Sequence, residues 1–202
     1  MVKNFIFTVT TGRAGQETLY QILQECSINC LSAFEHPNFK QKLPFFLGDI
    51  ERKIRRRFFE TDELLGRGKV LIAYANRDYK YIEKIAKKRL KVIESKMEQE
   101  KITNYFDISK FYIRGLYKGF NQIIKSFSLV FLVRDPLLNM KSFHNRNKNF
   151  FLDNISPFEE CNLLRMHLND LSKKELYLWA WAETFLRYKK LSHSKKVVKS
   201  VI

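Results

Sequence analysis

Two short stretches of the sequence carry residues that suit the binding of a phosphate or sulfate group. The first is TTGRAGQETL, in which Gly12 and Gly15 bracket Arg13 and Ala14 directly after an apolar run. A glycine turn between a strand and a helix aims backbone N–H groups at an anion, and the helix adds the positive end of its dipole. We therefore expect an anion at this turn. The alternative is a plain strand-to-helix turn with an exposed arginine.

Two common nucleotide-binding loops do not match this stretch. The loop of nucleoside triphosphatases needs the pattern G-x-x-x-x-G-K-[ST], but Glu17 lies five positions after Gly12 and no Lys-Thr pair follows it. The dinucleotide pattern G-x-G-x-x-G fails as well, because Ala14 and Glu17 stand where its second and third glycines belong. A triphosphatase and a dinucleotide-dependent enzyme are therefore disfavoured.

The second stretch is SLVFLVRDPLLNMKSFHNR, an apolar run that ends in Arg134-Asp135-Pro136. An arginine at the carboxyl end of a parallel strand lies where open α/β sheets bind their ligands. Pro136 is typical of a first helical position, and Ser142 follows about two turns later. A hydroxyl and a guanidinium can share one phosphate there. The alternative is a surface pair of Arg134 with Asp135 that has no ligand.

The rest of the pattern supplies elements that could position these residues. Apolar runs predict strands, and helical periodicity together with capping residues predicts helices. The expected strands are 5–10, 28–34, 70–75, 102–108 and 128–133, and the expected helices are 16–25, 49–65, 79–100, 111–125 and 136–146. This alternation indicates a three-layer α/β sandwich with a central parallel sheet. We expect strand 28–34 to neighbour strand 5–10, and we expect two helices and no strand in 154–191.

The composition is strongly basic, with 37 Lys and Arg against 21 Asp and Glu and a formal net charge of +16. Such a charge favours an anionic partner, and nucleic acid, anionic lipid, a polyphosphate cofactor and an acidic glycan all fit it. We expect the three cysteines Cys26, Cys30 and Cys161 to be reduced and buried. No signal peptide and no apolar run of about 18 residues is recognisable, which predicts a cytoplasmic protein.

The two stretches, in this order and more than a hundred residues apart, resemble the family of sulfotransferases that use 3′-phosphoadenosine 5′-phosphosulfate, PAPS. The resemblance implies the P-loop nucleotide-hydrolase-like sulfotransferase fold and covers most of residues 4–190. It implies a loop for the 5′-phosphosulfate and a site for the 3′-phosphate. The loop residues are Arg13, Ala14, Gly15, Gln16, Glu17 and Thr18, and the 3′-phosphate residues are Arg134 and Ser142.

The resemblance also implies the reaction. A sulfuryl group would pass from PAPS to a hydroxyl acceptor, a carbohydrate or a glycolipid, with 3′-phosphoadenosine 5′-phosphate, PAP, as product and no metal required. Arg13 would stabilise charge on the leaving phosphate. Glu35 is the preferred base by similarity to glycan and protein-tyrosine members, and His36 is the alternative. We interpret Lys110, which follows strand 102–108 at the same edge of the sheet, as a surface lysine, and contact with the sulfate or the acceptor is the alternative.

The sequence departs from the family in two places. Gln16 and Glu17 stand where the family loop carries hydroxyls. The chain is expected to form a single domain, 1–202, with an α/β nucleotide-binding core over 1–150 and a helical part over 151–202 that ends before the last strand of many members.

These departures keep two other functions open. One is a relative that binds the nucleotide without turnover, and the other is a basic nucleic-acid-binding protein. The second alternative rests on charge alone, so we expect no nucleic acid partner. Contact of a basic face with a membrane surface is compatible with the charge.

Overall fold

The described residues form a five-stranded sheet in which every pair of neighbouring strands is parallel. The computed structural model describes residues 3–34, 50, 54, 61–145, 156–167 and 171–202. The strand order is β2-β3-β1-β4-β5. The strands are β1 (Asn4–Val9), β2 (Cys30–Ala33), β3 (Asn104–Asp107), β4 (Phe127–Phe131) and β5 (Val197–Val201). Parallel strands need crossover connections, and the helices provide them.

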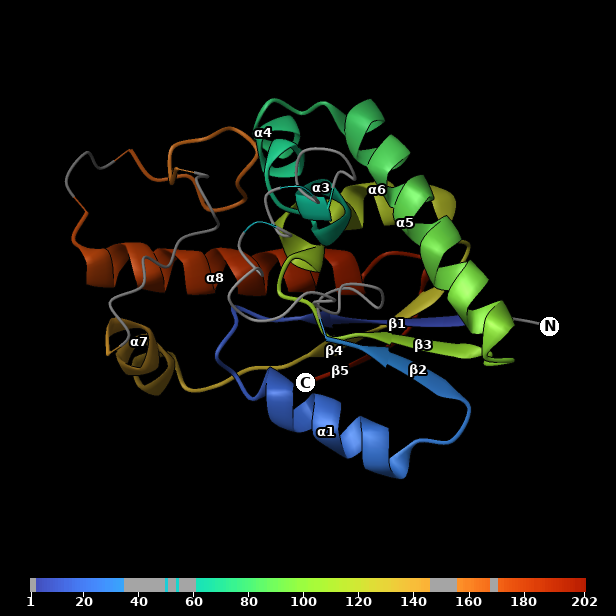
Figure 1. Ribbon diagram of the computed structural model, residues 1–202. Coiled ribbons are helices and arrows are strands. Elements are labelled where there is room, and N and C mark those ends of the chain that lie inside the picture. The colour runs from blue at the N-terminus through green and yellow to red at the C-terminus, as the bar shows by residue number, and fades with distance from the viewer. Residues whose placement is uncertain (1–2, 35–49, 51–53, 55–60, 146–155, 168–170) are drawn as a thin grey trace.

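The helices cover both faces of the sheet (Figure 1). One face carries α1 (Gln16–Cys26). The other face carries α5 (Tyr79–Gln99), α6 (Tyr117–Ile123) with the π-helical turn Tyr112–Leu116 before it, and α8 (Lys173–Ser192). The short helices α3 (Thr61–Leu65) and α4 (Lys69–Ala75) pack beside α5, and α7 (Pro136–His144) lies beyond the carboxyl ends of the strands. The protein is therefore a three-layer α/β sandwich.

The core lies between the sheet and the helical layer that contains α5. Phe7 of β1 is fully buried and lies at its centre. Its ring stacks on Tyr112 with the ring centroids 4.3 Å apart, and it contacts Phe120 of α6 and Phe127 of β4. Aromatic rings bury more apolar surface than other side chains, so this cluster ties β1 and β4 to the helical layer. The carboxyl ends of these two strands are thereby held at one edge of the sheet.

Most of the expected elements are confirmed, but residues 70–75 are not a strand. They belong to helix α4, in which Val70, Leu71, Ala73 and Tyr74 are buried while Ile72 is 61% exposed. A short apolar run can be a buried strand or a buried helix, and its sequence period does not distinguish them. The contacts of α4 with α5 and with the π-helical turn decide the matter here. The expected helix 49–65 lies largely outside the described residues, apart from α3.

Two further expectations about the sheet are wrong. Strand β2 pairs with β3 and not with β1, so one strand separates it from the first loop. Residues 151–202, expected to be a helical part, contain a strand, because β5 pairs with β4 from Phe127 to Val130. Its sequence VVKSV lacks a long apolar run, since β5 is an edge strand whose residues after Val197 are exposed. Residues 156–167 contain no helix, and α8 is the one helix described in 154–191.

The cysteines are free thiols, as expected, but they are not all buried. Cys26 is exposed, while Cys30 and Cys161 are partly buried. Burial raises the pKa of the Cys30 and Cys161 thiols above the usual value of a cysteine.

Candidate functional site

A cavity of about 370 Å³ opens at the carboxyl edge of the sheet, between the first loop and the end of β4. This edge is where open parallel sheets bind ligands. The cavity brings together residues that are more than a hundred positions apart in the sequence. Its lining consists of Gly12, Arg13, Gly15, Gln16, Glu17, Thr18, Phe34, Lys110, Arg134 and Phe143.

The loop before α1 has the backbone of an anion-binding turn. Gly12, Arg13 and Gly15 all have positive φ, at 90°, 56° and 96°. Gly15 caps α1 without a side-chain hydrogen bond, so the cap residue leaves the first N–H groups of the helix open to a ligand. These N–H groups begin at Gln16, which lines the cavity. The start of α1 therefore offers donors and the positive end of its dipole to the cavity.

Asn139 of α7 holds the outer side of this loop. Its side chain is fully buried, and Nδ2 donates to the carbonyl oxygens of Gly12 and Arg13 at 3.1 Å each. In a trans peptide unit the carbonyl of one residue and the N–H of the next point in opposite directions. With both carbonyls turned toward Asn139, the N–H groups of Arg13 and Ala14 point away from α7. The two hydrogen bonds from Asn139 therefore leave the N–H groups of Arg13 and Ala14 out of contact with α7.

Tyr177 of α8 fixes the orientation of this amide. Its hydroxyl donates to Oδ1 of Asn139, so Nδ2 is the atom that faces the loop carbonyls. Tyr177 is 1% exposed, and burial raises its pKa, while a hydrogen bond with Thr11 opposes that rise. The neutral hydroxyl is therefore retained over the physiological pH range. Sequence reasoning missed both residues, because an asparagine and a tyrosine within helical patterns carry no local signal of this contact.

Three cations and one carboxylate line the cavity. Arg13, Lys110 and Arg134 come from three different segments, and Nη1 of Arg134 donates to the Arg13 carbonyl at 3.5 Å. Lys110, expected at the surface, is partly buried, and its side chain lies next to Gly12 of the glycine turn. A Cβ on Gly12 would lie 3.1 Å from Cδ of Lys110, a tight contact that the lysine would have to relieve, and the φ of 90° at position 12 itself favours glycine. The balance of charge favours an anion, although Glu17 opposes it.

The structure brings most of the expected site residues together and leaves two of those it describes outside the cavity lining. Arg13, Gly15, Gln16, Glu17, Thr18 and Arg134 line the cavity together. Ala14 belongs to the same loop but is not in the lining, and neither is Ser142, which lies partly buried on α7. The side chain of Gln16 donates to the carbonyl of Ile108 at 3.4 Å and so ties the loop to the end of β3. Glu35 and His36, the expected bases, lie outside the described residues.

The corner after β4 is built as the sequence predicts. Asp135 caps α7, because its carboxylate accepts a hydrogen bond from the Leu138 N–H at 2.9 Å, and Pro136 occupies the first turn. Asp135 thus has a structural role in starting the helix, and Arg134 remains directed to the first loop.

A buried ion pair supports the edge next to the cavity. Asp107, the last residue of β3, binds Arg89 of α5, and both side chains are fully buried. The Tyr105 hydroxyl donates to the same carboxylate at 3.1 Å. Burial raises the pKa of Asp107, and the Arg89 guanidinium opposes that rise. This pair joins α5 to the strand that precedes Lys110 and so helps to place that lysine.

Neither the search of protein-family models nor the search of curated proteins finds a match for this chain. No helix within the described ranges combines the length and the apolar character needed to cross a bilayer. In the same ranges, His, Cys, Asp and Glu side chains form no group of three that could hold a metal ion. The fold and the cavity therefore define this chain as an α/β protein with a basic pocket at the carboxyl edge of its sheet.

Proposed function

We propose that the protein is a sulfotransferase that transfers a sulfuryl group from PAPS to a hydroxyl of a carbohydrate or glycolipid. The observation that carries the proposal is the meeting of the first loop with Arg134 in one basic cavity. These are the two stretches that resemble the 5′ and 3′ sites of the PAPS-dependent family. The fold is of the kind that the family requires, although an α/β sandwich with a parallel sheet serves many functions.

The residues of the cavity fit the 5′ end of the donor. The loop amides and the start of α1 would hold its phosphosulfate, and Arg13 and Lys110 would stabilise negative charge that grows on the leaving phosphate. Arg134 would contact the 3′-phosphate. Because Ser142 is not in the lining, the second ligand expected for that phosphate has no support from the geometry.

The donor, when bound, supplies the sulfuryl group and a good leaving group. A bond forms between the acceptor oxygen and sulfur, and the bond between sulfur and the bridging phosphate oxygen breaks. The proton of the acceptor hydroxyl must pass to a base, for which Glu35 stays our prediction and His36 the alternative. No step needs a metal if the guanidinium, ammonium and amide groups balance the charge.

One observation favours a second function, a relative that binds the nucleotide without turnover. Glu17 is exposed in the first turn of α1 and lines the cavity, so its carboxylate opposes a phosphosulfate group. Gln16 is engaged with the Ile108 carbonyl instead of providing a hydroxyl. Binding of PAP without product formation from PAPS would identify this function.

Calorimetric titration with PAP tests the proposal, with adenosine 5′-monophosphate and ATP as comparison ligands. We expect the wild type to prefer PAP, and Arg134→Ala and Lys110→Ala to weaken PAP binding by about tenfold or more each. Arg77→Ala is the matched control, because Arg77 is an exposed arginine that pairs with Glu160 and does not line the cavity. Equal affinity for PAP and adenosine 5′-monophosphate, or equal losses in all three variants, would refute the nucleotide site. A screen of hydroxyl acceptors with PAPS then tests transfer itself.

A further inference from the structure

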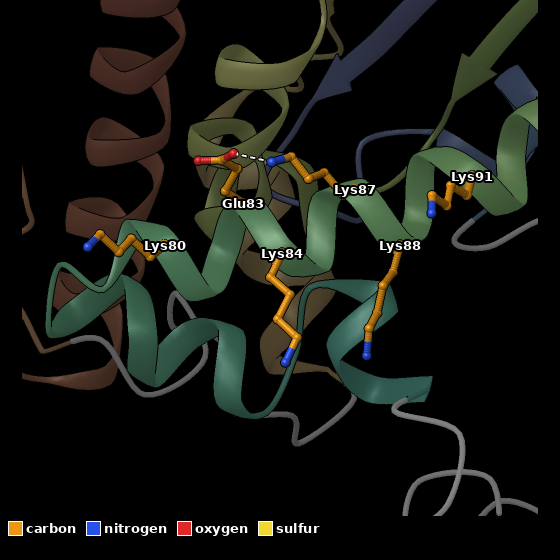
Figure 2. A pocket seen from close by; sticks show the side chains of 6 residues that line it. All are labelled: Lys80, Glu83, Lys84, Lys87, Lys88 and Lys91. Atoms are coloured by element: carbon orange, nitrogen blue, oxygen red, sulfur yellow. Dashed lines mark ion pairs between the residues drawn. The ribbon is translucent and has the colours of Figure 1, made fainter.

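Residues 79–91 of α5 carry five exposed lysines and one carboxylate on the outer side of the helix (Figure 2). We refer to the lysines as the lysine face, which consists of Lys80, Lys84, Lys87, Lys88 and Lys91. They lie opposite the buried side of the helix, which includes Ile82, Ile85 and Ile93. With a rise of 1.5 Å per residue, the row is about 17 Å long. Glu83 pairs with Lys87 at 2.6 Å, and Lys88 has an interaction of its own.

This arrangement is electrostatically unfavourable in the isolated protein. Lys80 and Lys84 are four positions apart, and like charges at this spacing destabilise a helix. The first turn of α5 contains no acidic residue, although Asp78 caps its start, so Lys80 lies near the positive end of the helix dipole. Lys80, Lys84 and Lys91 make no ion pair with any residue that the structure describes.

Two of the three acidic residues of α5 lie in its last six residues, C-terminal to the lysine face. Glu94 and Glu98 bind Lys3, at 3.7 Å and 2.7 Å. Charges of opposite sign are thus separated along one helix, although interspersed charges would stabilise it better. The lysine face therefore departs from the charge pattern that would stabilise the helix best. Such departures are expected at functional or strained sites.

We propose that the lysine face docks the protein onto an anionic lipid bilayer. A row of lysines on one side of a helix attracts the negative surface of such a membrane, and each lysine adds to the binding. The lysines lie on one side of a single 21-residue helix, so they form a continuous basic surface that a bilayer can meet. The proposal does not depend on the reaction that the cavity performs.

A bilayer fits this surface better than a nucleic acid does. The lysine face and Glu83 line a shallow pocket (Figure 2), and the described lining of this pocket contains no aromatic side chain on which bases could stack. Arg89, the arginine of α5, is buried against Asp107 and cannot bind a phosphate in the bidentate manner typical of nucleic-acid contacts. Lysine is a hydrated point charge, which suits a diffuse negative surface.

Docking through this face leaves the cavity open. Helix α5 covers the face of the sheet opposite α1, while the cavity lies at the carboxyl edge beside the start of α1 (Figure 1). A membrane under the lysine face would therefore not cover the loop that contains Gly12 and Arg13.

Vesicle flotation tests the proposal with two variants of equal charge. The first removes three charges from the lysine face with Lys80→Gln, Lys84→Gln and Lys91→Gln. The control removes three exposed charges elsewhere with Lys125→Gln, Lys173→Gln and Lys195→Gln. Each protein is mixed with vesicles of phosphatidylcholine alone and with vesicles that also contain phosphatidylserine. A duplex oligonucleotide in the same buffer is the comparison ligand.

We expect the wild type to bind only the anionic vesicles, and the first variant to lose about tenfold or more of that binding while the control retains most of it. Equal losses in both variants would overturn the proposal, because only net charge would then matter. Tighter binding of the oligonucleotide than of the vesicles, abolished in the first variant, would overturn it in favour of nucleic acid. The first variant should melt no lower than the wild type, since like charges have been removed. A lower melting temperature would contradict the electrostatic cost on which the proposal rests.

Discussion

Tyr177 donates its hydroxyl hydrogen to Oδ1 of Asn139, and this contact joins α8 to α7 directly behind the first loop. Both side chains are buried. Because Oδ1 is engaged, Nδ2 of Asn139 faces the loop and holds the carbonyl oxygens of Gly12 and Arg13. The orientation of the loop amides therefore depends on two residues that do not line the cavity.

Replacing Asn139 should impair anion binding more than it impairs folding. We expect Asn139→Ala to weaken binding of PAP by about tenfold, since the two loop carbonyls lose their donor and the peptide units can rotate. The cost in stability should be about 1–3 kcal/mol, typical of buried acceptors left without a partner. Calorimetry and urea unfolding measure the two effects.

Asn162 provides the matched control for this prediction. It is also a buried asparagine, and its Nδ2 donates to the carbonyls of Ser156 and Pro157 at 2.7 Å and 3.3 Å, away from the cavity. Asn162→Ala should lower stability by a similar amount and leave PAP binding unchanged. If both variants weakened PAP binding equally, Asn139 would have only a structural role. Tyr177→Phe should have a smaller effect of the same kind as Asn139→Ala.

The pair of Arg89 with Asp107 should show strong coupling in a double-mutant cycle. Asp107→Ala leaves a guanidinium buried without this carboxylate, and we expect a loss of about 3–5 kcal/mol in the free energy of unfolding. Arg89→Met combined with Asp107→Ala should cost less than the sum of the two single changes, because no uncompensated charge remains. Additive losses would show that the two charges do not stabilise each other.

Gly119 should not tolerate a side chain. It lies on α6 where this helix meets α5, and a Cβ there would come within 2.7 Å of both the Ala86 Cβ and the Ile82 carbonyl oxygen. We expect Gly119→Ala to destabilise the protein by about 1–3 kcal/mol through overpacking. Adding Ala86→Gly should restore only part of the loss, since the carbonyl is backbone and cannot move aside. Full restoration in thermal melts would show that the Cβ contact alone matters.

The three thiols should differ in their reaction with iodoacetamide. Cys26 is exposed and should react first at about pH 8. Burial raises the pKa of Cys30 and Cys161, so in the folded protein a smaller fraction of each is thiolate at this pH. Their rates should therefore keep rising as the pH increases beyond the usual pKa of a cysteine, because the thiolate fraction grows up to the raised pKa. Mass spectrometry of peptides after timed quenching measures each rate, and equal rates at the three sites would contradict the burial argument.

Local patterns in the sequence are sufficient for the elements that carry the candidate site. Helix α5 follows from its apolar period, and β1 and β4 follow from short apolar runs next to turn residues. The glycine turn and the Arg134-Asp135-Pro136 corner were recognisable for the same reason: turn geometry and helix capping depend on neighbouring residues. From these elements alone the parallel sheet and the cavity edge could be inferred.

Contacts between distant segments decided what the local pattern could not. Residues 70–75 are apolar enough for a strand, but packing against the π-helical turn makes them helix α4. The order of the strands, with β3 between β1 and β2, depends on how the helical layer packs and not on any single run of residues. Lys110 reaches the first loop because β3 pairs with β1 there. Asn139 and Tyr177 hold the loop because α7 and α8 meet behind it, more than a hundred positions later in the chain.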